Sequence, residues 1–305
     1  MKKHYIPLMM VALLATACGH RASNGTTADG DSAAVAADAT DAFIVDSVCK
    51  TFEDSMVSVK VSVDWPSGSN DALVSSIRKY ICEELAAGLT VEGKPDVILY
   101  KDGNAAVDST TTQQANNLLA AYQEAKTNGA LFDGMQFMYS LHVFKSEETA
   151  TYVTYLSNAE GFQGGAHGFA TSTGMTFSKK DGSRIGYQCQ YNADANTFDM
   201  QDQTLFSKPD AAPLAVLVKE GVRSYFKAFD LTVSSDEQLK EQLIGVNNVD
   251  SIPLPNTPPV FTKDGLAFVY QQYEIAPYAA GMINFTIPYD KVRPFLTSEA
   301  ASLIK

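Results

Sequence analysis

The sequence predicts an α+β fold, a two-part module of largely antiparallel sheets packed with helices. Three features predict this class. Some segments alternate apolar and polar residues, which is typical of half-buried strands, and others repeat apolar residues every three or four positions, which is typical of amphipathic helices. Tight turns at residues 180–183 and 263–265 join neighbouring strands directly. Such turns favour antiparallel sheets, whereas a regular alternation of strand and helix would favour a parallel one.

The first residues of the chain are typical of a secretion signal. Lys2 and Lys3 precede an apolar run over 6–17, which is too short to span a bilayer. Residues 14–18 are similar to a bacterial lipoprotein processing site, where the cysteine, here Cys18, is acylated and becomes the new N-terminus. An ordinary cleaved signal is the alternative. In both cases we expect export to the cell envelope, and a lipid would hold the protein on the outer membrane, on its periplasmic face or at the cell surface.

Residues 19–42 consist mainly of Ala, Asp, Thr, Ser and Gly, which leave little to bury and predict a disordered tether. The organisation predicted for the whole chain has four segments. They are a signal peptide over 1–17, a lipidated N-terminus and tether over 18–43, an N-terminal α+β part over 44–200, and a C-terminal α+β part over 201–305.

A strand and a helix open the N-terminal part. Alternating valines over 57–63 predict the strand, and apolar residues at every fourth position over 73–85 predict the helix. An N-cap at Ser69 or Asn70 begins this helix, and Gly88 marks its end. A second helix over 112–127 and two alternating strands over 135–144 and 151–158 follow.

The rest of the chain continues the mixed pattern. Its predicted elements are a hairpin over 169–191, a helix over 212–229, and strands over 260–261, 266–273 and 282–288. The helix places Leu214, Val218 and Phe226 on one face, which predicts a second apolar core. No internal repeat of solenoid length occurs in the sequence.

The charge of the chain is acidic. The formal net charge is −12, and removal of residues 1–17, which hold two lysines and no acids, makes it −14. This balance argues against nucleic acid as a partner, because nucleic-acid binding needs a basic face. It either favours encounter with a basic partner or serves only to keep an exported protein soluble.

The sequence contains no recognisable catalytic or metal-binding motif. The spacings of zinc proteases, serine hydrolases, P-loop proteins and dinucleotide-binding proteins do not occur. His142 and His167 are the histidines available for a site, and nothing in their spacing predicts a metal centre or a cofactor. Beyond Cys18, Cys49, Cys82 and Cys189 allow at most one disulfide, and the sequence does not choose the pair.

Two segments stand out as candidate sites. Residues 161–168, "GFQGGAHG", hold four glycines around His167. They form either a turn whose imidazole bonds a neighbouring carbonyl, which we favour, or a nest of N–H groups beside a catalytic base or ligand. Residues 273–281, "YEIAPYAAG", hold Glu274 and Tyr278, which suit sugar stacking or a protein interface if exposed, or a core of hydrogen-bonded tyrosines if buried.

Three segments together resemble a known family. They are "GGAHG" at 164–168, "TLF" at 204–206 and "FTKDGLAFVYQQYEIAPYAAGMINFTIPYDKV" at 261–292. They are similar to the extracytoplasmic module of the lysozyme-sensing anti-sigma factor RsiV, a module found also beside some peptidoglycan deacetylase domains and in bacterial lipoproteins of unknown function. The resemblance covers about residues 44–296. It implies an α+β module in two parts, with the glycine–histidine loop near their junction, and a binding role in the cell envelope.

The function that we predict is therefore non-enzymatic binding, with no cofactor. The expected ligand is a basic protein such as lysozyme, or peptidoglycan, and the expected binding residues are His167, Glu274 and Tyr278. Two alternatives remain: a hydrolase of envelope polymers with His167 and Glu274 as acid and base, which requires the two side chains to converge, and a structural envelope lipoprotein.

Overall fold

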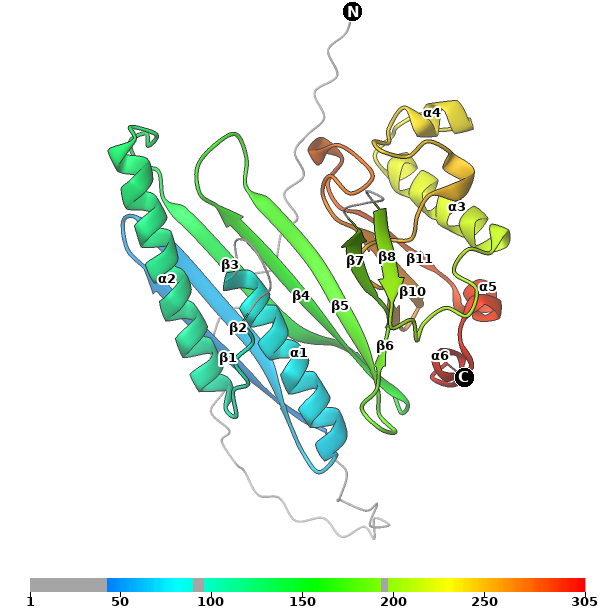
Figure 1. Ribbon diagram of the computed structural model, residues 1–305, viewed down its shortest axis with the longest axis horizontal. Helices are drawn as coiled ribbons and strands as arrows, with labels where there is room; N and C mark the ends of the chain where they lie inside the picture. Colours follow the sequence, from blue (N-terminus) through cyan, green and yellow to red (C-terminus); the bar gives the residue numbers. More distant parts are fainter. Residues whose placement is uncertain (1–42, 90–95, 193–196, 305) are drawn as a thin grey trace, which may run out of the picture.

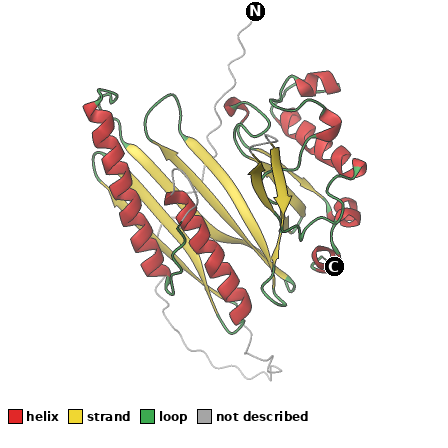
Figure 2. Ribbon diagram, in the orientation of Figure 1, coloured by secondary structure: helices red, strands yellow, loops and turns green. Residues whose placement is uncertain are grey.

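The computed structural model describes residues 43–89, 96–192 and 197–304. The predicted signal peptide, the acylated Cys18 and the tether over 19–42 all lie outside these residues. In the described part, helices and mainly antiparallel strands are combined, and the predicted α+β class is confirmed. Figure 2 shows the helices in red and the strands in yellow.

A six-stranded sheet dominates the N-terminal part (Figure 1). Its strands follow chain order: β1 (Ile44–Glu53), β2 (Val57–Ser67), β3 (Phe137–Glu148), β4 (Tyr152–Phe162), β5 (Phe169–Ser178) and β6 (Arg184–Ile185). Only β2 and β3 run parallel within this sheet. Two helices supply the crossover between them, α1 (Asp71–Leu89) and α2 (Gly103–Thr127), and Figure 1 shows both on one face of the sheet.

The C-terminal part is built on a smaller antiparallel sheet. Its order is β11 (Ile283–Ile287), β10 (Gly265–Tyr270) and β9 (Val260–Thr262), and α3 (Ala212–Ala228) packs against β11. A two-stranded ribbon, β7 (Gln188–Asn192) and β8 (Thr197–Gln201), lies beside it. The short helices are α4 (Asp236–Lys240), α5 (Tyr289–Val292) and α6 (Ser298–Ser302), with single 3₁₀ turns at η1 (Val249–Ser251), η2 (Tyr278–Ala280) and η3 (Arg293–Phe295).

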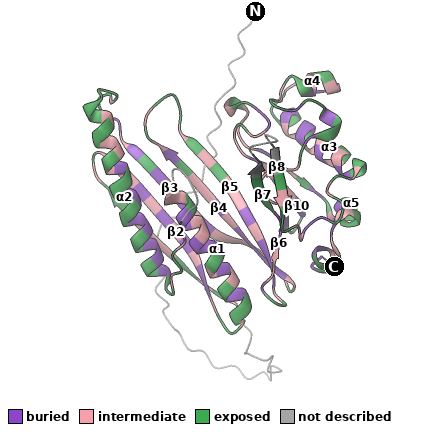
Figure 3. Ribbon diagram, viewed as in Figure 1, coloured by how far each residue is buried: buried purple, intermediate pink, exposed green. Residues whose placement is uncertain are grey.

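Two hydrophobic cores correspond to the two predicted apolar patterns (Figure 3). The valines of β2 at positions 57, 59, 61 and 63 are at most 1% exposed, and they share one core with the apolar residues of α1. The predicted buried face of this strand is therefore confirmed. Asn70 begins α1, because its side-chain oxygen accepts from the Leu73 amide at 3.1 Å. The second core joins Leu214, Val218 and Phe226 of α3 to the small sheet.

Three elements differ from the sequence-based expectation. β1 was not predicted, because its residues are mostly half-buried or exposed and show no alternation of apolar side chains. α2 begins at Gly103, well before the predicted start at 112, where Asp102 caps it by accepting from the Asn104 amide at 2.7 Å. In the hairpin predicted over 169–191, only the two residues of β6 return along β5, and β7 pairs with β8 instead.

The two parts meet along β4, β5 and β9. The Thr154 hydroxyl donates to the Phe261 carbonyl at 2.8 Å, and the Phe261 amide donates to the Thr176 hydroxyl at 3.1 Å. Both threonines are fully buried. Since buried polar groups cost free energy unless paired, these bonds position the small sheet on the large one.

Candidate functional site

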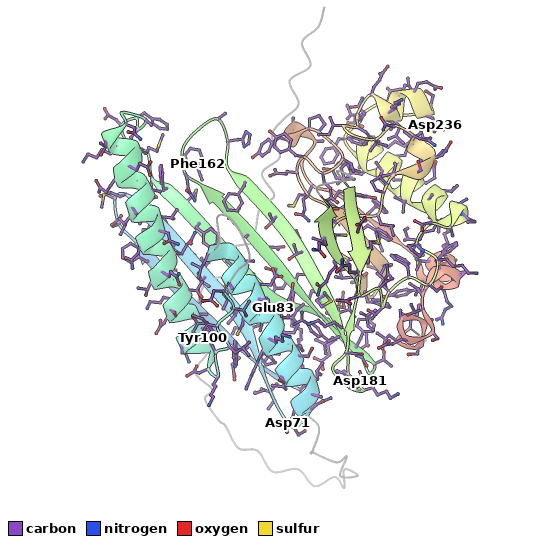
Figure 4. The ribbon with its side chains drawn as sticks, viewed as in Figure 1. Asp71, Glu83, Tyr100, Phe162, Asp181 and Asp236 are labelled. Atoms are coloured by element: carbon purple, nitrogen blue, oxygen red, sulfur yellow. The ribbon has the colours of Figure 1, made fainter. Side chains whose placement is uncertain are left out.

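The glycine–histidine loop connects β4 to β5, as the sequence indicates. Figure 4 shows Phe162, the last residue of β4, at one end of the large sheet, with Asp181 of the following turn at the other end. Gly164 and Gly165 have φ angles of 87° and 84°, in the left-handed region that favours glycine. The glycine pair therefore serves as a backbone device that reverses the chain.

His167 lies at the end of this loop, exposed to solvent, and contacts the C-terminal part. Its Nδ1 lies 2.8 Å from the Gly168 carbonyl oxygen, and its Nε2 lies 3.3 Å from the Tyr273 hydroxyl. A carbonyl can only accept, so Nδ1 carries a proton and donates. In the neutral imidazole Nε2 is then the acceptor for the tyrosine hydroxyl.

The His167 ring also stacks on Tyr278, with centroids 3.8 Å apart and an angle of 20° between the planes. The Tyr273 ring lies 6.2 Å from His167 and 5.8 Å from Tyr278. We call these three residues the ring cluster. The Tyr273 side chain is exposed, at 55%, and Tyr278 is half-buried. Of the two alternatives that the sequence left open for this segment, the exposed one holds for Tyr273, and the ring cluster presents aromatic surface to solvent.

The backbone that carries Tyr273 is unusual. Its φ is +66°, in a region that residues with a side chain rarely adopt. Glu274 holds the turn in place, because its carboxylate accepts from the Gln271 amide at 2.7 Å and from the Asn256 amide at 2.5 Å. Burial raises the pKa of Glu274, and these two backbone hydrogen bonds lower it. Through these two hydrogen bonds, Glu274 fixes the backbone of the loop that carries Tyr273. We call this pair of bonds the Glu274 bracket.

Two glutamines next to Tyr273 bind the exposed edge of β5. The Gln271 side chain accepts from the Ser172 amide at 3.0 Å and donates to the Ser172 carbonyl at 2.8 Å. Gln272 accepts from the Ala170 amide at 3.2 Å. Gln271 and Gln272 therefore contact β5 at positions 172 and 170, and Tyr273 contacts His167 in the loop that precedes β5. These contacts fix the ring cluster at the junction of the two parts.

The predicted site residues are thus only partly brought together. His167 and Tyr278 are stacked, whereas the carboxylate of Glu274 is directed to backbone amides, and no hydrogen bond in the described part of the chain joins it to His167. His142 lies elsewhere, on β3, where its ring stacks on Phe144 at 4.4 Å. Burial lowers the pKa of His142, and the positive charge of Lys60 acts in the same direction, while Asp64 raises it.

Sequence reasoning missed Gln271 and Gln272. Their signal is a polar pair directly after the apolar strand β10, at a point where the sequence predicted that the strand continues to Tyr273. β10 ends at Tyr270, and the two amide side chains imitate a neighbouring strand. A glutamine pair of this kind has no sequence signature by itself, since its partner is 99 positions away.

Sequence reasoning also missed a group of polar side chains between α1 and the large sheet, which consists of Glu84, Thr173 and Tyr139. The Thr173 hydroxyl donates to the Glu84 carboxylate at 3.1 Å, and the Tyr139 hydroxyl is buried without a hydrogen-bond partner among the described residues. Burial raises the pKa of Glu84, and hydrogen bonds from Ser157 and Thr173 lower it. Burial raises the pKa of Tyr139 as well, and the nearby Glu84 charge adds to the effect.

Other features bear on the kind of site that the chain can hold. Within residues 43–89, 96–192 and 197–304, no cluster of three His, Cys, Asp or Glu side chains is arranged to bind a metal ion. Cys82 and Cys189 are free thiols, so no pair among Cys49, Cys82 and Cys189 is bridged. In the same ranges, no helix combines the length and the apolar character that a membrane crossing requires.

Comparisons with known proteins point to one family. Residues 204–290 match the model described as "Protein of unknown function (DUF3298)". This range contains most of the second and third segments on which the resemblance depends, and the ring cluster's Tyr273 and Tyr278, but not His167. No curated protein matches the chain.

Two solved structures share the fold. One is a member of the DUF3298 family from Bacteroides fragilis NCTC 9343, with a TM-score of 0.61, 19% identity, and coverage of 85% of this chain and 96% of that one. The other is a DUF3298 family protein from Pseudomonas aeruginosa PAO1, with a TM-score of 0.51, 12% identity, and coverage of 86% and 97%. At these identities the likeness concerns the fold. The chain thus carries a DUF3298 match in its C-terminal part, on a fold that two solved structures of that family share along nearly their whole length.

Proposed function

We propose that this protein is a non-enzymatic binding module of the cell envelope, anchored by a lipid on Cys18, and that the ring cluster contacts its ligand. The observation that carries the proposal is the exposed Tyr273, held at a φ of +66° beside His167 and Tyr278. Strained backbone persists only where surrounding structure enforces it, and it concentrates at functional sites. Here the Glu274 bracket and the glutamine contacts to β5 enforce it.

The chemistry of the ring cluster suits two ligands that the sequence predicts. Tyrosine and histidine faces stack on the apolar faces of sugars, and tyrosine faces attract the cationic side chains of a basic protein. The net charge of −12 would speed the encounter with a basic protein such as lysozyme. The resemblance to the RsiV module supports lysozyme in particular, and peptidoglycan is the second ligand of the proposal.

The proposal includes no catalysis by His167 and Glu274. An acid and a base must reach the same reacting group, and these two side chains direct their hydrogen bonds to different partners. A direct check is His167→Ala. A variant that keeps its fold and its binding but loses a measurable hydrolysis of envelope polymers would establish the hydrolase alternative.

The test is calorimetric titration of the full chain with lysozyme at low and moderate salt, and in parallel with soluble peptidoglycan fragments. We expect saturable binding that Tyr273→Ala weakens by about tenfold or more, since central aromatic contacts contribute most of the energy of an interface. Leu99→Ala is the control, because Leu99 is 64% exposed and its neighbour Tyr100 lies far from Phe162, towards the other end of the large sheet in Figure 4.

The two ligands give different salt responses. Lysozyme binding should weaken as salt rises, because screening reduces the attraction between opposite charges, and binding of an uncharged glycan should not. Absence of heat with both ligands, or equal loss in Tyr273→Ala and Leu99→Ala, would contradict the proposal.

A further inference from the structure

Strand β1 forms one edge of the large sheet. It pairs with β2 over ten residues, from Ile44 opposite Ser67 to Glu53 opposite Ser58, and in the described part of the chain it has no second neighbour. An edge strand presents a row of backbone N–H and C=O groups that a further strand can bind. Proteins usually protect such an edge with proline, a bulge, an outward lysine or a very short strand.

β1 lacks most of these protections. Its sequence, IVDSVCKTFE, contains neither proline nor glycine, and its register with β2 is continuous. Its one lysine, Lys50, is paired with Asp108 of α2 at 2.7 Å. At the two ends of the strand, Ile44 and Phe52 are 51% and 37% exposed. The edge is therefore long, regular and bordered by apolar side chains.

Antiparallel geometry restricts how β1 could pair with β1 of a second copy. Two residues that face each other across an antiparallel ladder direct their backbone groups either both towards the partner strand or both away from it, and the two kinds of residue alternate along a strand. The two facing positions must then both be odd or both be even. A two-fold axis between two β1 strands consequently passes through a residue and not between residues.

An axis through Val48 gives complementary neighbours on one face of the strand. Asp46 then faces Lys50 of the second copy, and Ile44 faces its Phe52. All these side chains lie on the face that carries the helices, because Val48 is opposite Val63 and Lys50 is opposite Val61 on β2. Opposite charges and apolar pairs in facing positions stabilise a sheet.

Axes through the neighbouring residues 49 and 50 give less favourable pairs of facing side chains. An axis through residue 50 sets Lys50 against itself and Asp46 against Asp54, and an axis through residue 49 sets Asp46 against Phe52. Of these three axes, only the one through Val48 sets both Asp46 and Lys50 against an opposite charge.

The surface beside the edge leaves room for a second copy. A shallow hollow of about 640 Å³ is lined by Lys50 and by small or polar side chains of α2, namely Ala105, Asp108, Ser109, Thr112, Gln113 and Asn116. None of the α2 side chains that line this hollow is large and apolar, so none of them would block an approaching strand.

We propose that the protein forms a two-fold dimer through β1, with the axis at Val48, so that the two large sheets join into one. Symmetric pairs of this kind close after two copies and do not continue into filaments. β5 and the ring cluster lie four strands from this edge, so the dimer would leave both ring clusters open. The dimer does not depend on the proposed function, although it would make ligand binding bivalent.

Sedimentation equilibrium of the full chain over a concentration series tests the proposal. We expect a species of twice the 32.9 kDa mass of the chain. Asp46→Lys should raise the Kd of the dimer by about tenfold or more, because it places like charges opposite each other at two symmetric positions. Asp46→Lys combined with Lys50→Asp should restore the dimer. Asp133→Lys makes the same charge change on an exposed loop and should leave the dimer intact.

Cross-linking tests the register. In a Cys49→Ser background, Val48→Cys should form a covalent dimer on mild oxidation, since facing residues lie within disulfide range. Thr51→Cys should not, because two residues at position 51 would be about 20 Å apart. Circular dichroism verifies the fold of each variant. A monomer at all concentrations, a dimer that Asp46→Lys does not weaken, or a cross-link at position 51 instead of 48 would overturn the proposal.

Discussion

Tyr273 adopts a backbone conformation that costs free energy, and the chain accepts that cost at an exposed aromatic residue. A left-handed conformation costs a residue with a Cβ atom roughly 1–2 kcal/mol relative to glycine. Glu274 and Gln271 hold this conformation in place, because their side chains form hydrogen bonds with backbone groups of the surrounding structure. At the residue scale, the candidate site is therefore a strained tyrosine whose backbone is held by the hydrogen bonds of two neighbouring polar side chains.

The strain at Tyr273 predicts that a glycine variant is more stable than an alanine variant, the reverse of the usual order. Tyr273→Gly should be more stable than Tyr273→Ala by about 1 kcal/mol, because glycine adopts a φ of +66° without the Cβ penalty. Urea denaturation of both variants measures the difference. At an ordinary loop position alanine is the more stable residue, and that order here would contradict the strain.

Glu84 predicts a pH dependence. Burial raises the pKa of Glu84, so the folded state holds this proton more tightly than the unfolded state does. As pH rises above the ordinary value of 4.5 through the raised pKa, Glu84 lowers the stability of the fold. Glu84→Gln removes this contribution.

We therefore expect the free energy of unfolding of Glu84→Gln, relative to wild type, to increase between about pH 4 and about pH 8. Urea titrations over this range measure it. Glu160→Gln, at an exposed position of β4, is the control and should show a much smaller change. A difference that is independent of pH, or that decreases, would disprove the assignment.

Helix α3 shows how one small residue determines the packing of an element. Gly221 lies in the middle of this helix, where a Cβ atom would stand 2.2 Å from the Phe285 ring of β11. That ring stacks in turn on Phe268 of β10, with centroids 5.1 Å apart. A glycine inside a helix lowers its intrinsic stability, and here the close approach of the sheet explains its presence.

Gly221→Ala should therefore destabilise the protein by about 1–3 kcal/mol, the usual cost of overpacking a core. Helix propensity alone predicts the opposite sign, a gain of about 1 kcal/mol. The measurement is thermal or urea unfolding of Gly221→Ala, of Phe285→Leu and of the double variant. The double variant should recover part of the loss, and strictly additive effects would show that the two positions do not collide.

On the scale of the whole molecule, the two parts form a continuous structure. Tyr152, Ile185 and Tyr187, which precede the predicted boundary at residue 200, are buried in the core of the C-terminal part. Thr154 and Thr176 of the large sheet bind both backbone groups of Phe261. The boundary itself stays a prediction, but these contacts make independent motion of the two parts costly.

The junction predicts that Thr154→Val is destabilising. The variant keeps the shape of the side chain and removes the hydroxyl that donates to the Phe261 carbonyl, so the cost should be about 1–3 kcal/mol. Thr171→Val, at an exposed position of β5, should change stability by less than about 0.5 kcal/mol. Equal effects of the two variants in urea denaturation would show that the junction bond contributes little.

Most of the regular elements could be predicted from the sequence, and most of the site could not. The alternating valines of β2 and the four-residue spacing in α1 encode burial locally, so the sequence predicts correctly which face of each element is buried. β1 has no such pattern, because an edge strand buries little and depends on pairing with β2. The same holds for Tyr273: its sequence neighbours predict a strand, and only the bracket of Glu274 and Gln271 turns the backbone away.

The sequence by itself determined the α+β class, the apolar faces of the main helices and strands, and the glycine turn around His167. Each of these depends on neighbours within a few positions along the chain. Only the tertiary structure decided that His167 stacks on Tyr278, that Glu274 binds amides instead of facing His167, and that β1 forms an edge. The bond from Asn256 to Glu274 joins residues 18 positions apart, and the contact between His167 and Tyr273 joins residues 106 positions apart. β1 becomes an edge only through the strand order of the whole sheet, and no local periodicity records such relations.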